Sequence, residues 1–304
     1  MHRIIPPSPS YPLMANQPNR AKLHHYVPVS YLKRFTDQKG FLYIRDVARN
    51  QSRYDKPKNI MWIRDYYRQT WAPAGINQNI LEDGLASGIE GQIKPIIDCL
   101  LDSPEAITTE YASQLMVYME VQRFRVPRQA AWAKELMRAT ILRLAPADIA
   151  EQIESGVFQL TMKNSARFDY MRMAVGTLHP WLARMEWEVF DAEAGSSFIT
   201  TDSPVSFYNP AFPPPAEAGI GLAGTKVFFP LSSRKLLLMR HPECRSMPPL
   251  TVLPQPTEQT SAVALTFGTT WDAVRVRKMN WKLAQLAHEL FVAESDIALT
   301  ETGR

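Results

Sequence analysis

Four polar residues in three separate segments carry the side chains best suited to catalysis or anion binding. His24 and His25 stand side by side, Arg123 lies in an otherwise apolar helical pattern, and Asp202 ends a strand-like run. An imidazole can act as a general base near neutral pH or as a metal ligand. A carboxylate at the end of a strand is well placed for presentation to a ligand. These four residues are the predicted catalytic set.

A divalent metal ion would require several of these groups together. The candidate ligands are His25, Glu90 and Asp202. The alternative is structural, because an arginine among apolar residues needs a carboxylate or another anion. In that case Arg123 would form an ion pair with Glu90 or Asp202 and hold a helix against a sheet.

The elements expected around these residues change in character along the chain. Pro28 keeps the segment of the two histidines extended, so their side chains point to opposite faces. A short strand at 41–44 follows. Apolar residues then recur at spacings of three and four over about 79–178, which predicts helices, one of them breaking at Pro127.

The remainder of the chain is rich in strand-like runs. Residues of about 181–275 predict an antiparallel sheet, and 279–292 predicts a closing amphipathic helix. A turn at 194–196 between two such runs predicts a hairpin. The fold class is therefore α+β, with a flexible tail over 1–20 and a single domain over 21–304.

Composition bounds the class of protein. Apolar residues make up 45% and charged residues 21% of the 304 positions, which is an ordinary globular balance. Two distant cysteines, Cys99 and Cys244, argue for a reducing compartment and against a cysteine-based zinc site. Neither a membrane-spanning run nor a secretory signal is evident, so we expect a cytoplasmic protein without membrane contact.

The charge is distributed unevenly. Residues 1–70 contain 13 Lys/Arg and 4 Asp/Glu, a net charge of +9, whereas the remaining chain carries a net charge of −5. Tyrosines, phenylalanines and one tryptophan are interleaved with the basic residues, particularly over 20–70. Such a segment suits nucleic acid as a partner. The simpler interpretation is that the basic face pairs with the acidic remainder of the same chain.

Four segments in a fixed order resemble a known family. They are HHYVP at 24–28 with YLKRF at 31–35, QRFRVP at 122–127, FITTDSPV at 198–205, and FPLS at 229–232. Together they resemble the bacterial family called domain of unknown function 4238, from about Lys22 to Val292. The resemblance implies this α+β architecture and marks His24, His25, Arg123 and Asp202, with Glu82 and Glu90 as weaker additions. The family name assigns no reaction.

Three hypotheses follow. The first is a metal-assisted hydrolase of nucleic-acid phosphodiesters, in which a histidine acts as base or ligand, Asp202 binds the metal and Arg123 stabilises the phosphoryl charge. The second is a non-catalytic module that binds single-stranded nucleic acid or an acidic protein through its basic segment. In the third, the marked polar residues form a buried network that fixes the front of the chain against the sheet.

Overall fold

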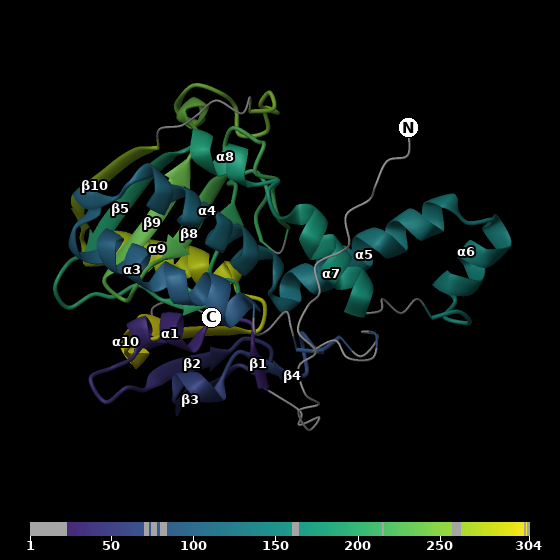
Figure 1. The fold of residues 1–304 in the computed structure, drawn as a ribbon, viewed down its shortest axis with the longest axis horizontal. Coiled ribbons are helices and arrows are strands. Elements are labelled where there is room, and N and C mark those ends of the chain that lie inside the picture. The colour runs from purple at the N-terminus through teal and green to yellow at the C-terminus, as the bar shows by residue number, and fades with distance from the viewer. Residues whose placement is uncertain are drawn as a thin grey trace, which may run out of the picture.

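The computed structural model describes residues 23–69, 73, 78–79, 84–159, 164–214, 216–256, 263–300 and 302. Within them the chain builds two larger sheets, a two-stranded ribbon and a set of helices (Figure 1). The predicted α+β class and the order of its parts are confirmed.

A five-stranded sheet forms the centre of the molecule. Its strands lie in the order β10-β5-β9-β8-β7. They are β5 (Glu186–Ala192), β7 (Ser206–Tyr208), β8 (Lys226–Pro230), β9 (Lys235–Arg240) and β10 (Ala264–Trp271). The prediction of an antiparallel sheet holds for four of these strands, whereas β10 runs parallel to β5.

Helices cover both faces of this sheet, which explains why β8 and β9 read as continuous apolar runs. Phe229 and Leu237 belong to one core cluster with α3 (Gly91–Asp102) and α4 (Thr109–Phe124). Phe228 and Leu236, one position away, belong to a second cluster with α9 (Ala273–Leu286). Successive residues of a strand point to opposite faces, so the apolar positions 227–230 and 236–239 are all buried by one helix layer or the other.

A four-stranded antiparallel sheet joins distant parts of the chain. Its order is β3-β2-β11-β6, and all its pairings are antiparallel. The strands are β2 (Leu42–Asp46), β3 (Gln51–Asp55), β6 (Thr200–Thr201) and β11 (Leu290–Ala293). The front of the chain is thus built into the same sheet as its end.

Two sequence predictions are wrong in this region. The hairpin around 194–196 does not form, because β5 pairs with β9 and β10 while β6 pairs with β11. The closing helix begins earlier than predicted, at Ala273 after its cap Asp272, and ends at Leu286. The last predicted helical residues instead form β11, where three consecutive apolar side chains are buried between two neighbouring strands.

The N-terminal part of the described chain, residues 23–69, is called the front segment and starts with a two-stranded ribbon. Strands β1 (Leu23–His25) and β4 (Trp62–Arg64) pair antiparallel. Between them lie α1 (Val29–Leu32), the 3-10 turn η1 (Lys33–Phe35), the strands β2 and β3, and the 3-10 turn η2 (Pro57–Asn59). The predicted extended conformation of the histidine segment is confirmed.

The helical middle follows its sequence signals closely. The Thr108 hydroxyl caps α4 by accepting from the Tyr111 N–H, and α5 (Pro127–Leu144) begins at the predicted proline. A π-helix, η3 (Leu85–Glu90), passes into α3 at Gly91, four residues before Pro95. Pro95 lies inside α3, and its missing N–H leaves the Gly91 carbonyl without its α-helical donor.

The remaining helices complete the architecture. They are η4 (Pro104–Ala106), α6 (Ala147–Glu154), α7 (Asn164–Ala174), α8 (His179–Arg184), η5 (Pro242–Arg245) and α10 (Asp296–Thr300). Figure 1 shows α5 and α6 extending away from the sheets as an arm. None of the helices in the described part of the chain has the length and apolarity needed to cross a membrane.

Candidate functional site

The two adjacent histidines lie on opposite sides of β1 and have different surroundings. His24 is completely buried, its ring stacks on Tyr67 at 5.6 Å, and its Nδ1 accepts the Tyr67 N–H at 2.8 Å. His25 is partly exposed, and its Nε2 donates to the Lys58 carbonyl at 3.2 Å. Burial lowers the pKa of His25, which favours its neutral form. His24 is therefore a structural element of the core, and His25 is the histidine nearer to solvent.

Arg125, two residues after the predicted Arg123, holds the histidine segment in place. Its guanidinium is buried and donates to the carbonyl of Tyr26 at 2.8 Å and to that of His25 at 3.2 Å. It also pairs with Glu90, Nη1 to Oε1, at 2.9 Å. Gln122 donates to the same Tyr26 carbonyl at 2.9 Å. The carboxylate of Glu90 is therefore engaged by an arginine that the sequence analysis had not selected.

Asp202 is buried at 3% exposure and receives three backbone N–H groups. Its Oδ1 accepts from His288 at 2.9 Å, and its Oδ2 accepts from Glu289 at 2.6 Å and Leu290 at 2.9 Å. Burial raises the pKa of Asp202, while the three N–H donors act in the opposite direction. The carboxylate thus fastens the end of β6 to the connection between α9 and β11.

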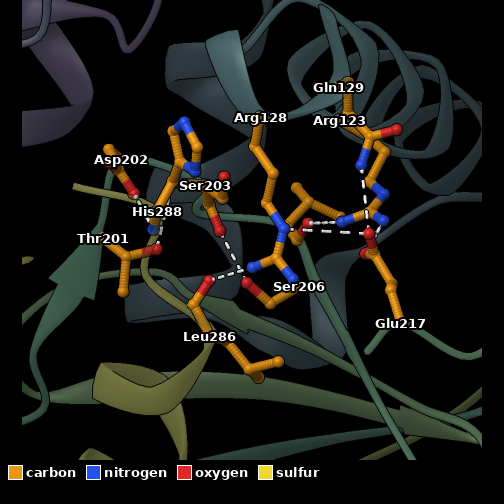
Figure 2. A network of polar contacts seen from close by, with 11 residues as sticks. Arg123, Arg128, Gln129, Thr201, Asp202, Ser203, Ser206, Glu217, Leu286 and His288 are labelled. Carbon is orange, nitrogen blue, oxygen red and sulfur yellow. Dashed lines mark hydrogen bonds and ion pairs between the residues drawn. The ribbon is translucent and has the colours of Figure 1, made fainter. Parts of the chain in front are cut away.

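Arg123 joins a third cluster, around Glu217 in the long loop 209–224. Figure 2 shows Arg123, Arg128 and Gln129 directed toward the Glu217 carboxylate. Arg123 forms an ion pair with it, Gln129 donates at 3.3 Å, and the Arg128 Nε lies 3.8 Å away. The Arg123 guanidinium also donates to the Val205 carbonyl at 3.1 Å. Burial and the neighbouring Arg128 lower the pKa of Arg123.

The predicted site residues therefore do not form one centre. Glu90 and the carbonyl of His25 contact Arg125, whereas His24 contacts Tyr67, and Arg123 and Asp202 each have separate partners. The predicted pairing of Arg123 with Glu90 or Asp202 is wrong, since its partner is Glu217. No three His, Cys, Asp or Glu side chains among the described residues are grouped so as to hold a metal ion, so the set His25, Glu90 and Asp202 is not assembled. Glu82 lies outside the described residues.

A tyrosine that the sequence analysis did not single out connects the motifs. The Tyr31 hydroxyl donates to the Pro230 carbonyl at 2.7 Å and lies 2.8 Å from the Thr200 hydroxyl. Its ring stacks on Phe229 at 5.6 Å. Since Arg125 contacts Tyr26, all four motif segments meet around the buried front segment. The sequence signal for this role was the position of Tyr31 in the YLKRF motif that follows the histidine pair.

Residues 23–294 match the family described as Protein of unknown function (DUF4238). This chain belongs to that family. No curated protein and no solved structure matches the chain. The matched span contains all four motif segments. The residues that resemble the family motifs are therefore also the residues that meet at the buried junction around Tyr31 and Arg125.

In the described part of the basic segment of this DUF4238 protein, three cations, Arg34, Arg49 and Arg68, pair with carboxylates. Within the described residues, Arg34 with Asp98 at 2.8 Å is the only ion pair that links this segment to the acidic remainder of the chain. Within the described residues, this pair is the direct support for the interpretation that the basic face pairs with the acidic remainder of the chain. Exposed cations with no carboxylate within 4 Å remain among the described residues of this segment, namely Lys33, Lys39, Arg53, Lys58 and Arg64.

An aromatic stack lies beside these cations at the outer edge of the four-stranded sheet. Phe41 and Tyr54 stack at 4.6 Å with their planes 7° apart, and the Lys56 ammonium lies 5.1 Å from the Phe41 ring. Tyr54 is 44% exposed although it belongs to a strand. Its hydroxyl donates to Asp37 at 2.8 Å, a hydrogen bond that raises the pKa of Tyr54 to about 12 and fixes the ring. Edge strand β3 therefore presents an aromatic side chain to solvent.

Proposed function

We propose that this DUF4238 protein is a binding module for single-stranded nucleic acid, and that β2, β3 and η2 form its contact surface. The observation that supports this most directly is the stack of Lys56, Phe41 and the exposed Tyr54, close in sequence to the exposed cations Arg53 and Lys58. Proteins that bind single strands combine cationic surfaces for the phosphates with aromatic side chains for the bases. Both features occur together on this edge of the sheet.

The charges on this edge are suited to a phosphate backbone. Arg53 and Tyr54 are neighbours on β3, so their side chains point to opposite faces of the edge strand, and both are exposed. Lys56 and Lys58 follow directly, on either side of Pro57. A strand of nucleic acid along β3 would therefore meet cations on both sides of the aromatic stack.

Binding is favoured over phosphodiester hydrolysis by the state of the marked residues. Both Asp202 oxygens already accept backbone N–H groups, and His24 is fully buried with its Nδ1 engaged. Arg123 is directed to Glu217 and not toward the basic surface. A hydrolase built on these residues would have to break these contacts before it could bind a substrate.

Fluorescence anisotropy with a labelled single-stranded oligonucleotide of ~20 nucleotides tests the proposal. We expect saturable binding whose affinity falls by at least about tenfold when the salt concentration rises from ~50 to ~200 mM. Tyr54→Ala should weaken binding by roughly 5- to 150-fold, the loss typical of one stacked base, whereas Tyr54→Phe should retain it. Arg53→Glu should also weaken oligonucleotide binding relative to the wild type, most strongly at low salt.

Matched variants control for general effects on the surface. Phe267→Ala removes an aromatic ring of similar exposure, 45%, on the opposite edge strand β10, and should bind like the wild type. Arg172→Glu reverses an exposed charge on α7 and should also be neutral. Absence of binding, or equal losses in Tyr54→Ala and Phe267→Ala, would refute the proposed surface. Cleavage of the oligonucleotide that disappears in His25→Ala would support the hydrolase hypothesis instead.

A further inference from the structure

Helix α5 of the arm and the residues that follow α6 carry many of the exposed apolar side chains. Of the 20 large apolar residues that are exposed in the described part of the chain, 8 lie between 127 and 175. They are Trp132, Leu136, Met137, Leu144, Val157, Phe158, Met173 and Val175. Figure 1 shows that α5 and α6 extend away from the sheets, while near the start of α5 Gln129 and Ala133 are buried and the Trp132 ring lies 6.2 Å from that of Tyr170 in α7. Clusters of this kind on a protruding element mark surfaces that bind a partner.

The apolar residues of α5 form continuous surface. Trp132 and Leu136 are four positions apart and lie on the same side of the helix. Met137 and Leu144 are seven positions apart and also share a side. The outer half of α5 is therefore apolar over a broad face in a helix of ~27 Å.

The two helices of the arm, α5 and α6, are called its limbs, and they carry opposite charges. Helix α5 has Lys134, Arg138 and Arg143 beyond its first turn, against a single Glu135. Helix α6 has acidic residues and no basic residue, with Asp148, Glu151 and Glu154 all exposed. Within the described residues none of these charges on either helix forms an ion pair. The arm thus presents a basic limb and an acidic limb, each without a neutralising partner.

We infer that the arm binds the arm of a second copy of this chain. In a two-fold dimer the basic α5 of one protomer lies along the acidic α6 of its partner, and symmetry repeats the same contact. The unpaired charges of both limbs are then neutralised, and the apolar face of α5 is buried between the two arms. A self-complementary surface of this kind specifies a second copy more directly than a partner of uniform charge, and α6 would repel nucleic acid. This inference is independent of the proposed binding function.

Charge reversal on each limb provides a decisive test. In the first variant, Arg138→Glu with Arg143→Glu makes both limbs acidic. In the second, Glu151→Lys with Glu154→Lys makes both limbs basic. Each variant alone should be monomeric because like charges meet, whereas an equimolar mixture of the two should form a heterodimer in which both contacts are again attractive. Sedimentation velocity of the wild-type chain, each variant and the mixture measures these states.

The control is a matched double reversal elsewhere, Arg275→Glu with Lys278→Glu on α9, which should leave the dimer intact. Thermal unfolding of each variant checks that the arm remains folded. A monomeric wild type over the whole dilution series would overturn the inference, and the arm would then be assigned to a different partner. Variants that remain dimeric on their own would also overturn it, because the contact would lie elsewhere.

Discussion

Removal of the Asp202 carboxylate is the perturbation that best separates a structural from a catalytic role of the family motif. In Asp202→Ala, the N–H groups of His288, Glu289 and Leu290 lose their acceptor together. All three donors lie between α9 and the central strand β11, so the loss acts on the junction of the four-stranded sheet. We expect a large loss of stability whatever the substrate of the protein.

The magnitude follows from the number and kind of these contacts. A hydrogen bond to a charged group contributes about 1.5–3 kcal/mol, and an unsatisfied buried donor costs about 1–3 kcal/mol. The three donors belong to consecutive residues and their losses do not add fully, so Asp202→Ala should cost about 3–5 kcal/mol. At about 2 °C per kcal/mol for a chain of this size, the melting temperature should fall by about 6–10 °C. Asp202→Asn keeps one acceptor oxygen but directs an NH2 at the donors, so it should lose about half as much.

Thermal unfolding followed by circular dichroism measures these differences. The control is Asp169→Ala, which removes an exposed carboxylate from an i,i+3 surface pair with Arg172 and should shift the melting temperature by less than about 2 °C. A melting temperature of Asp202→Ala within about 1 °C of the wild type would refute the structural role. The carboxylate would then have to be explained by function.

Two further predictions concern buried groups. Arg125→Lys keeps a positive charge but loses the forked donors to the Tyr26 and His25 carbonyls, so we expect a loss of about 2 kcal/mol in urea unfolding, and an unchanged unfolding midpoint would contradict this. Burial lowers the pKa of His241, whose Nε2 lies 2.7 Å from the Ile220 carbonyl, and it lowers the pKa of His25 as well. The folded state therefore disfavours their protonation, so stability should be complete above the usual histidine pKa and should fall as the pH drops from ~7.5 to ~5. His241→Gln should make this decline shallower, and an identical pH profile of wild type and variant would contradict the assignment.

Much of the fold could be predicted because local signals and tertiary structure agree there. The cap at Thr108, the break at Pro127 and the extended histidine segment depend on the chain within a few residues. The errors occurred where pairing is non-local. Residues 290–293 continue an amphipathic pattern, but they become a strand because β2 and β6, from remote parts of the chain, offer ladders on both sides. The hairpin prediction around 194–196 failed for the same reason.

The pairings of the candidate site residues could not be predicted from the sequence. Arg123 and Arg125 stand two residues apart near the end of α4, and both are buried, so the sequence alone gives no reason to prefer either. Glu90, the partner of Arg125, precedes α4 in the sequence and ends the π-helix η3. Glu217, the partner of Arg123, follows α4 and lies in the loop 209–224. A buried arginine requires an anion, but only the three-dimensional arrangement decides which carboxylate supplies it.

The four motif segments meet at one buried junction, which explains how the residues of a family motif can stabilise the fold without binding a substrate. The front segment that carries the basic surface is held by Arg125 from the helices, and its own Tyr31 bonds to Thr200 and Pro230 on the two motif strands. Asp202 fastens β11, against which β2 forms its ladder. The orientation of β2 and β3, and hence of the exposed Tyr54, depends on these contacts although none of them reaches the surface. Motif residues and binding residues should therefore separate experimentally, since a change in the first group acts on stability and a change in the second acts on affinity.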